Sequence, residues 1–152
     1  MLRAGATTDE PIEAGIRAIQ QYHRAADEFA RGAAGPVKAL YSHADDVTLA
    51  NPFGPPVVSW RNASAALDFA STRFRDGEVT GFDGLAKHLT KELACILEME
   101  HWRAKVSGRE EITPFDLRVT TVFRREGDAW KVVHRHADPI STSHPDGPLR
   151  TS

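Results

Sequence analysis

Two histidines stand two positions apart near the end of the segment GDAWKVVHRHADP, residues 127–139. Side chains alternate between the two faces of a β-strand, so His134 and His136 should share a face with Trp130. A large aromatic residue in a small domain usually marks the buried face. Imidazoles on that face can transfer protons near neutral pH. His136 and His134 are therefore the candidate catalytic residues, and His136, nearer the strand end, is the stronger candidate.

A third histidine, His101, stands near the end of another alternating run, residues 93–102. We expect its face to be the inner one, with His101 in contact with a bound ligand. Three imidazoles could together hold zinc, but no aspartate or glutamate is predicted on this face to complete the metal shell. We therefore expect no metal and no other cofactor. The alternative is that all three histidines are structural, and Asp138 could also orient His136.

A predicted hairpin must position the two candidate catalytic residues. Its strands cover residues 116–125 and 129–137, and the sequence EGD between them is a turn signal. A three-residue loop would place Arg118 opposite His136. We favour a two-residue turn at Gly127–Asp128, because it collects apolar side chains on one face. The pairs that it predicts are Phe123 with Val132, Thr121 with His134, and Val119 with His136.

The opposite face of this sheet is predicted to be charged. It would carry Arg118, Arg124, Lys131 and Arg135, with Glu98 and Glu100 of a neighbouring strand within reach. A solvated or dimer-interface ladder explains these charges better than a catalytic cluster does. Three apolar residues, Ile96, Val122 and Val133, stand among them. Because the face is too apolar to be simply solvated, we expect a homodimer.

Apolar residues at helical spacing predict three helices ahead of the long strands. The first should begin after a cap at Thr8 or Asp9 and end near Gly32, and the second should cover residues 37–43. The third should run over residues 63–74 with Asn62 as its cap and Ala66, Leu67, Phe69 and Ala70 inside. A short strand is expected at residues 47–50, ahead of a proline-rich turn.

Composition limits the partners. The chain has 152 residues, 41% of them hydrophobic, with a formal net charge of −2 and no basic run, so we expect one globular domain and no nucleic-acid partner. No apolar run of about 18 residues is present, so we expect no membrane partner. The single cysteine, Cys95, allows no disulfide framework and suits the cytoplasm.

The order of these elements resembles that of the SnoaL-like group in the nuclear-transport-factor-2-like superfamily, which also contains the ketosteroid isomerases. The segments that carry the resemblance are DDVTLANPFG and LRVTTVFRREGDAWKVVHRHADP, and the match covers residues 10–139, with 140–152 as a loose tail. The resemblance implies an α+β cone, in which three N-terminal helices pack on a curved antiparallel sheet. It also implies a pocket at the open end and a homodimer through the outer sheet face.

The same resemblance argues against ketosteroid isomerase activity. The position of that family's carboxylate base is Asn51 here, and the position of its second carboxyl group is Thr121. Its oxyanion tyrosine falls near Ala25, about one turn from Tyr22. An amide cannot abstract a proton near neutral pH. We therefore expect no isomerisation of a 5-ene-3-ketosteroid.

Two classes of function remain open. The first is a small-molecule enzyme or binder that acts on a cyclic or carbonyl compound by acid/base chemistry in a mostly apolar pocket. Besides the two candidate catalytic residues, its pocket would be lined by Tyr22, Asn51, Phe53, Trp60, His101 and Thr121. The second is a noncatalytic dimerisation, assembly or ligand-binding module. An open cavity would favour the first class, and a filled one the second.

Overall fold

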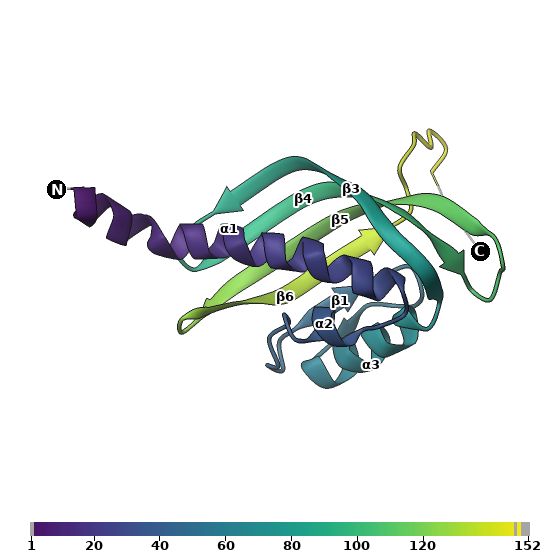
Figure 1. The fold of residues 1–152 in the computed structure, drawn as a ribbon, viewed down its shortest axis with the longest axis horizontal. Helices are drawn as coiled ribbons and strands as arrows, with labels where there is room; N and C mark the ends of the chain where they lie inside the picture. Colours follow the sequence, from purple (N-terminus) through teal and green to yellow (C-terminus); the bar gives the residue numbers. More distant parts are fainter. Residues whose placement is uncertain (1, 148, 150–152) are drawn as a thin grey trace.

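The computed structural model describes residues 2–147 and residue 149, and for residues 2–9 it describes the backbone only. Figure 1 shows α1 lying along a sheet of long strands, with α2, α3 and β1 gathered beside the C-terminal half of α1. The predicted α+β fold is confirmed. The elements of this part of the chain are α1 (Leu2–Ala30), α2 (Gly35–Lys38), β1 (Thr48–Ala50), β2 (Val57–Val58), α3 (Trp60–Ser71), β3 (Phe74–Leu89), β4 (Leu93–Val106), β5 (Ile112–Glu126) and β6 (Ala129–Asp138).

Helix α1 covers the inner face of the sheet with one apolar stripe. The ring centroid of Tyr22 lies 6.2 Å from that of Phe123 in β5, and that of Phe29 lies 6.5 Å from that of Trp102 in β4. The predicted start after Thr8 or Asp9 is wrong, since the helix begins at Leu2. The added residues include leucine, arginine and two alanines, which are all good helix formers, so nothing stops the helix at its predicted cap.

The second helix is shorter than predicted. It ends at Lys38 because the chain then turns to pair with β6. The Ser42 N–H donates to the Val132 carbonyl (2.9 Å), and the Val132 N–H donates to the Leu40 carbonyl (2.9 Å). The N–H groups of Ala39, Leu40 and Tyr41 still bond to carbonyls three or four residues earlier, and from Ser42 on, pairing with β6 takes the place of helical bonds.

The third helix begins and ends about three residues earlier than predicted. Its cap is Ser59, whose side-chain oxygen accepts a hydrogen bond from the Asn62 N–H at 3.2 Å, so the predicted cap at Asn62 is wrong. Leu67 and Ala70 are buried as expected. Phe69 is 53% exposed, so its predicted position inside the helix packing is wrong.

The sheet has the strand order β2-β1-β6-β5-β4-β3. All neighbouring strands are antiparallel except β1 and β6, which are parallel, so the sheet is mixed. Its long strands bend in Figure 1, and β3 has register shifts between Arg75 and Glu78, Val79 and Gly81, and Gly84 and Ala86. Such irregularities bend a strand and increase its twist, which lets β3 curve around α1.

A β-bulge in β6 decides which side chains face the interior. The turn at Gly127–Asp128 has two residues, as predicted, and Phe123 pairs with Val132. The next residue of β5, Val122, pairs with His134, so Val133 is an extra residue without a partner. Beyond the bulge the faces of β6 are exchanged.

The predicted pairs beyond Val132 are therefore wrong. Thr121 pairs with Arg135 and not with His134, and Val119 pairs with Ala137 and not with His136. Arg135 and Ala137 are buried on the inner face. The prediction that His134 and His136 share the inner face with Trp130 is wrong for the same reason.

The inner face of β4 is also the opposite of the predicted one. Its buried residues are Ala94, Ile96, Glu98, Glu100, Trp102 and Ala104. His101 therefore lies on the outer face, and the two glutamates and Ile96 lie on the inner one. Their predicted place in an outer ladder is wrong.

Beyond β6, residues 139–147 and 149 contain no helix or strand, and residues 148 and 150–152 of the expected tail lie outside the described residues. None of the helices described here is both long enough and apolar enough to cross a membrane.

Candidate functional site

A cavity of about 200 Å³ lies between the inner face of the sheet and the helices. Its wall is mainly aliphatic and aromatic, and its polar side chains are Tyr22, Asn51 and Arg135. The apolar lining residues come from all three helices, from β1, from the turn after it, from the long strands and from the segment after β6. They are Ala26, Phe29, Val37, Leu49, Pro52, Phe53, Leu67, Ala70, Phe74, Trp102, Val106, Phe115, Leu117, Ala137 and Pro139.

The charged group at this wall is one half of a buried ion pair. Arg135 Nη1 donates to Glu100 Oε2 at 3.0 Å, and Nη2 donates to Oε1 at 2.9 Å. Glu100 is 0% exposed and Arg135 is 8% exposed. The indole N–H of Trp102 donates to Glu100 Oε1 at 3.0 Å. Both carboxylate oxygens are thus held, and Glu100 fixes the guanidinium in place.

Arg135 has hydrogen-bond donors that Glu100 does not use. A guanidinium has five N–H groups, and Glu100 accepts two of them, which leaves three. In the part of the chain described here, no other acceptor bonds to this guanidinium. Its carbon lies 5.3 Å from the centroid of the Tyr22 ring, so the cation is also supported by an aromatic face. The Arg135 side chain, which belongs to a residue that lines the cavity, therefore has donors that the described residues do not use.

Electrostatics keep the ion pair charged and the two tyrosines neutral. Burial alone would raise the pKa of Glu100, but the Arg135 guanidinium and the hydrogen bonds hold that pKa below its usual value. Burial raises the pKa of Tyr22 and raises that of Tyr41 further. Since Glu100 is ionised and bonded through both oxygens, it is poorly suited to act as a general base at neutral pH.

A second buried carboxylate, Glu98, lies on the same face of β4 but does not line the cavity. Its oxygens are 2.9 and 3.0 Å from His23 Nε2, and the His23 ring stacks on Phe82 with centroids 3.7 Å apart. This pair ties α1 to β3 and β4.

Three of the eight predicted site residues, Tyr22, Asn51 and Phe53, line the cavity. The Asn51 side chain also forms the turn after β1, since its Oδ1 accepts a hydrogen bond from the Phe53 N–H at 3.0 Å. Trp60 and Thr121 do not line it. The Trp60 ring stacks on His43 with centroids 4.4 Å apart, and Thr121 is buried in β5 between Ile96 of β4 and Arg135 of β6.

The three predicted histidines lie on the outer face of the sheet. His101 Nδ1 is 2.8 Å from Asp116 Oδ1, and its Nε2 is 2.7 Å from Asp83 Oδ2. His134 Nδ1 is 2.7 Å from Thr48 Oγ1. His136 has a 54% exposed side chain, with Nε2 3.4 Å from Asp138 Oδ2. The structure therefore does not bring them together at the cavity, and the described residues contain no group of three metal-ligating side chains.

Opposite titration shifts should identify this outer-face arrangement. Hydrogen bonds to Asp83 and Asp116 raise the pKa of His101. Partial burial and the nearby His136 lower the pKa of His134. In an NMR pH titration, we expect His101 to titrate above the ordinary value of about 6.5 and His134 to titrate below it. The variants His101→Gln and His134→Gln would assign the signals, and shifts of the same sign would contradict the geometry.

Sequence reasoning missed both members of the buried ion pair. The available signal is weak: Glu98 and Glu100 share a strand face with Ile96, Trp102 and Ala104, which are as apolar as the residues on the other face. Uninterrupted alternation through Val133 predicts Arg135 on the outer face. Arg135 itself gives no further indication, because it stands between two histidines at a polar strand end.

Comparison with known proteins agrees with this architecture. The family described as the SnoaL-like domain matches residues 16–140. A nuclear transport factor 2-like superfamily protein from Salmonella enterica serovar Typhimurium has a TM-score of 0.73 at 18% identity, covering 92% of this chain and 99% of that chain. No match was found among curated protein sequences.

Two further solved structures carry names that suggest activities. A ketosteroid isomerase-like protein from Erwinia carotovora atroseptica has a TM-score of 0.70, and a proposed dehydratase of the NTF2-like family from Streptomyces avermitilis has one of 0.69. Each is 17% identical, and each match covers 88% of this chain and 99% of the other chain. At these identities the likeness shows the shared fold.

Proposed function

The chain belongs to the SnoaL-like domain family, and we propose that its cavity binds one small, mostly apolar carbonyl compound. The carbonyl oxygen accepts a hydrogen bond from Arg135, and the rest of the molecule contacts the apolar wall. The observation that carries this proposal is that Arg135 lines the cavity and that its guanidinium, which Glu100 fixes in place, still has unused donors. A few placed polar groups in an apolar pocket set a ligand's orientation.

Local charge favours a neutral ligand over an anion. Glu100 already balances the charge of Arg135, and Glu98 places a second carboxylate on the same inner face. A ligand carboxylate would add another negative charge in a poorly solvated site, which is costly. A neutral carbonyl oxygen needs only a donor.

Cavity size favours a ligand with one ring. An apolar cavity of about 150 Å³ accommodates benzene. The cavity here is about 200 Å³, which leaves room for a ring with a short carbonyl substituent. A steroid, with four fused rings, is too large for this space. The small volume of the cavity and the presence of Asn51 and Thr121 in place of two carboxylates thus give the same expectation, that the protein is not a ketosteroid isomerase.

Arg135 also suits a chemical role. A fixed cation beside a carbonyl oxygen stabilises the negative charge that develops there during enolisation or during elimination next to the carbonyl group. The isomerase-like and dehydratase names of the two solved relatives are compatible with such chemistry. This proposal gives no catalytic role to His134 or His136, because both lie on the outer face.

Matched one-ring probes test the proposal. Acetophenone carries the carbonyl group, α-methylstyrene has nearly the same shape without the oxygen, and benzoate carries the anion. By isothermal titration calorimetry or ligand-observed NMR, we expect acetophenone to bind about 10- to 100-fold more tightly than α-methylstyrene, the worth of a hydrogen bond to a charged group. Benzoate should bind more weakly than acetophenone. Failure of all three to bind would refute the proposal, and tightest binding of benzoate would refute its neutral-ligand part.

The outer sheet face supports the assembly role that the sequence left open. Leu93 and Leu97 are exposed there, and Val122 is partly buried beside them. We propose that a second copy covers this face, so light scattering at micromolar concentration should give about twice 16.7 kDa. Leu97→Asp should shift the mass toward the monomer, whereas Val58→Asp, on β2, should not. A monomeric wild type would contradict this part of the proposal.

A further inference from the structure

We infer that Phe53 is the specificity residue that limits the ligand to one ring, because its side chain divides the cavity from a second hollow. The inference rests on the proposed function, since it concerns the ligand of the same cavity. It begins from a feature that the proposed function does not use, namely a second space on the other side of the turn after β1.

The second hollow has a volume of about 360 Å³ and is more open than the cavity. Its far wall comes from β2 and α3, through Val57, Asn62, Ala65, Ala66 and Phe69. Three residues, Leu49, Asn51 and Phe53, line both spaces. These three residues therefore form the boundary between them.

Leu49 and Asn51 are fixed by other roles. Leu49 is a buried residue of β1 whose backbone is in register with Arg135 in β6. The Asn51 side chain accepts the hydrogen bond that closes the turn. Changing either residue would therefore disturb the sheet or the turn, as well as the boundary.

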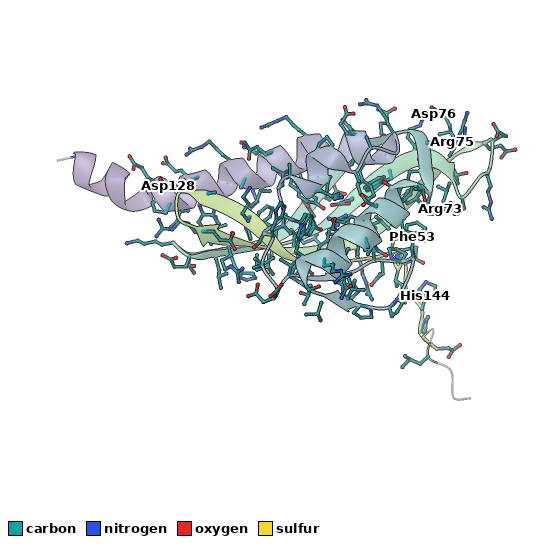
Figure 2. All side chains as sticks on the ribbon, turned by 90° about the horizontal axis from the view of Figure 1, so that it is seen from below. Phe53, Arg73, Arg75, Asp76, Asp128 and His144 are labelled. Carbon is teal, nitrogen blue, oxygen red and sulfur yellow. The ribbon has the colours of Figure 1, made fainter. Side chains whose placement is uncertain are left out.

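Phe53 instead contributes a ring from a stiff turn. Pro52 precedes it and Pro55 follows after one glycine, so the backbone has little freedom. The ring meets Phe74 edge to face, with centroids 5.6 Å apart and planes at 75°. Figure 2 shows Phe53 in the half of the molecule away from the hairpin turn at Asp128. Removing this ring should join the two spaces without moving the turn.

The joined space would accept a second fused ring. The ketone group would keep its place at Arg135, and the added ring would extend past position 53 toward α3. The informative quantity is the ratio of the affinities for a one-ring and a two-ring ketone. A general loss of affinity in a variant affects both ketones equally and leaves this ratio unchanged.

The test compares acetophenone with 2-acetonaphthone, which carries the same ketone group on two fused rings. In the wild type we expect acetophenone to bind more tightly. In Phe53→Ala the affinity for 2-acetonaphthone relative to acetophenone should rise about tenfold or more. One extra group that does not fit an apolar pocket has an effect of this size. Phe69→Ala is the matched control, because Phe69 lines only the second hollow and is 53% exposed. An unchanged ratio in Phe53→Ala, or an equal change in Phe69→Ala, would overturn the inference.

Failure of the proposed function can be told apart from failure of this inference. If the wild type binds neither ketone, the proposed function fails, and xenon, which binds apolar cavities, then tests the boundary by itself. Crystals of Phe53→Ala under xenon pressure should show a new xenon site where the ring had been, joined to the cavity, and its absence would contradict the inference. If Phe53→Ala does not fold, Phe53→Leu should give a smaller shift in the same direction, and no shift would count against the inference.

Discussion

Replacement of Glu100 by glutamine should lower the free energy of unfolding by about 3–5 kcal/mol, the usual cost of leaving one half of a buried ion pair without its partner. The cost arises at Arg135, which is buried, lies on the inner sheet face and cannot lose its proton. Glutamine has almost the same shape as glutamate and can still accept the Trp102 N–H. The loss therefore reports the missing charge and not a packing defect.

Urea denaturation with two optical probes would measure this loss. Glu110→Gln is the matched control, because Glu110 pairs with Arg75 at the surface, and its effect should stay within about 0.5 kcal/mol. The pKa of Glu100 is lowered in the folded protein, so its pairing stabilises the fold above its ordinary value of 4.5 and that contribution is lost as the pH falls through the lowered pKa. The difference between wild type and variant should therefore shrink in acid. A loss below about 1 kcal/mol at neutral pH would mean that Arg135 does not depend on Glu100.

Removal of both charges should separate stability from ligand recognition. In Glu100→Gln with Arg135→Met, no charge is left unpaired, and such replacements of buried pairs are often neutral or stabilising. We expect this double variant to regain most of the stability lost in Glu100→Gln. Its affinity for acetophenone should nevertheless fall about 10- to 100-fold, because the donor to the carbonyl oxygen is gone.

The hydrocarbon analogue supplies the control for this second prediction. The affinity of α-methylstyrene should change little in the double variant, since methionine keeps the wall apolar and of similar volume. Equal losses for both probes would indicate a damaged cavity. Full retention of acetophenone affinity would show that Arg135 does not bind the carbonyl oxygen.

The sequence was sufficient for the layout of the fold. Helical spacing located α1 and α3 to within a few residues, apart from the N-terminal extension, and the EGD signal gave the two-residue turn between β5 and β6. These features depend on local chemistry, such as apolar periodicity and turn propensity. Three residues of the cavity wall, Tyr22, Asn51 and Phe53, were also predicted.

The inner face of β6 could not be predicted in the same way. Its residues alternate without interruption in the sequence, and nothing in Val132-Val133-His134 marks an extra residue. The bulge is defined by pairing with Val122 and Phe123 of another strand. One unpaired residue reverses the face of every later side chain in the strand. His134 and His136 therefore lie on the outer face, and Arg135 lies on the inner face.

The buried face of β4 could not be predicted for a related reason. Burial of an ionised glutamate is tolerated only when an oppositely charged partner is present. The partner of Glu100 is Arg135, 35 positions away, and the predicted alternation in β6 puts Arg135 on the wrong face. If Arg135 is assigned to the outer face, Glu100 on the inner face would be a buried charge without a partner. One wrong register therefore concealed both halves of the ion pair.

A crystal structure of the wild type with 4-bromoacetophenone would test the central claim most directly, since anomalous scattering from the bromine locates the ligand and fixes its direction. We expect the ring in the cavity beside Phe53 and Phe74, with the carbonyl oxygen about 3 Å from a guanidinium nitrogen of Arg135. Bromine confined to the outer sheet face, or a ring in the cavity with its oxygen turned away from Arg135, would contradict the account.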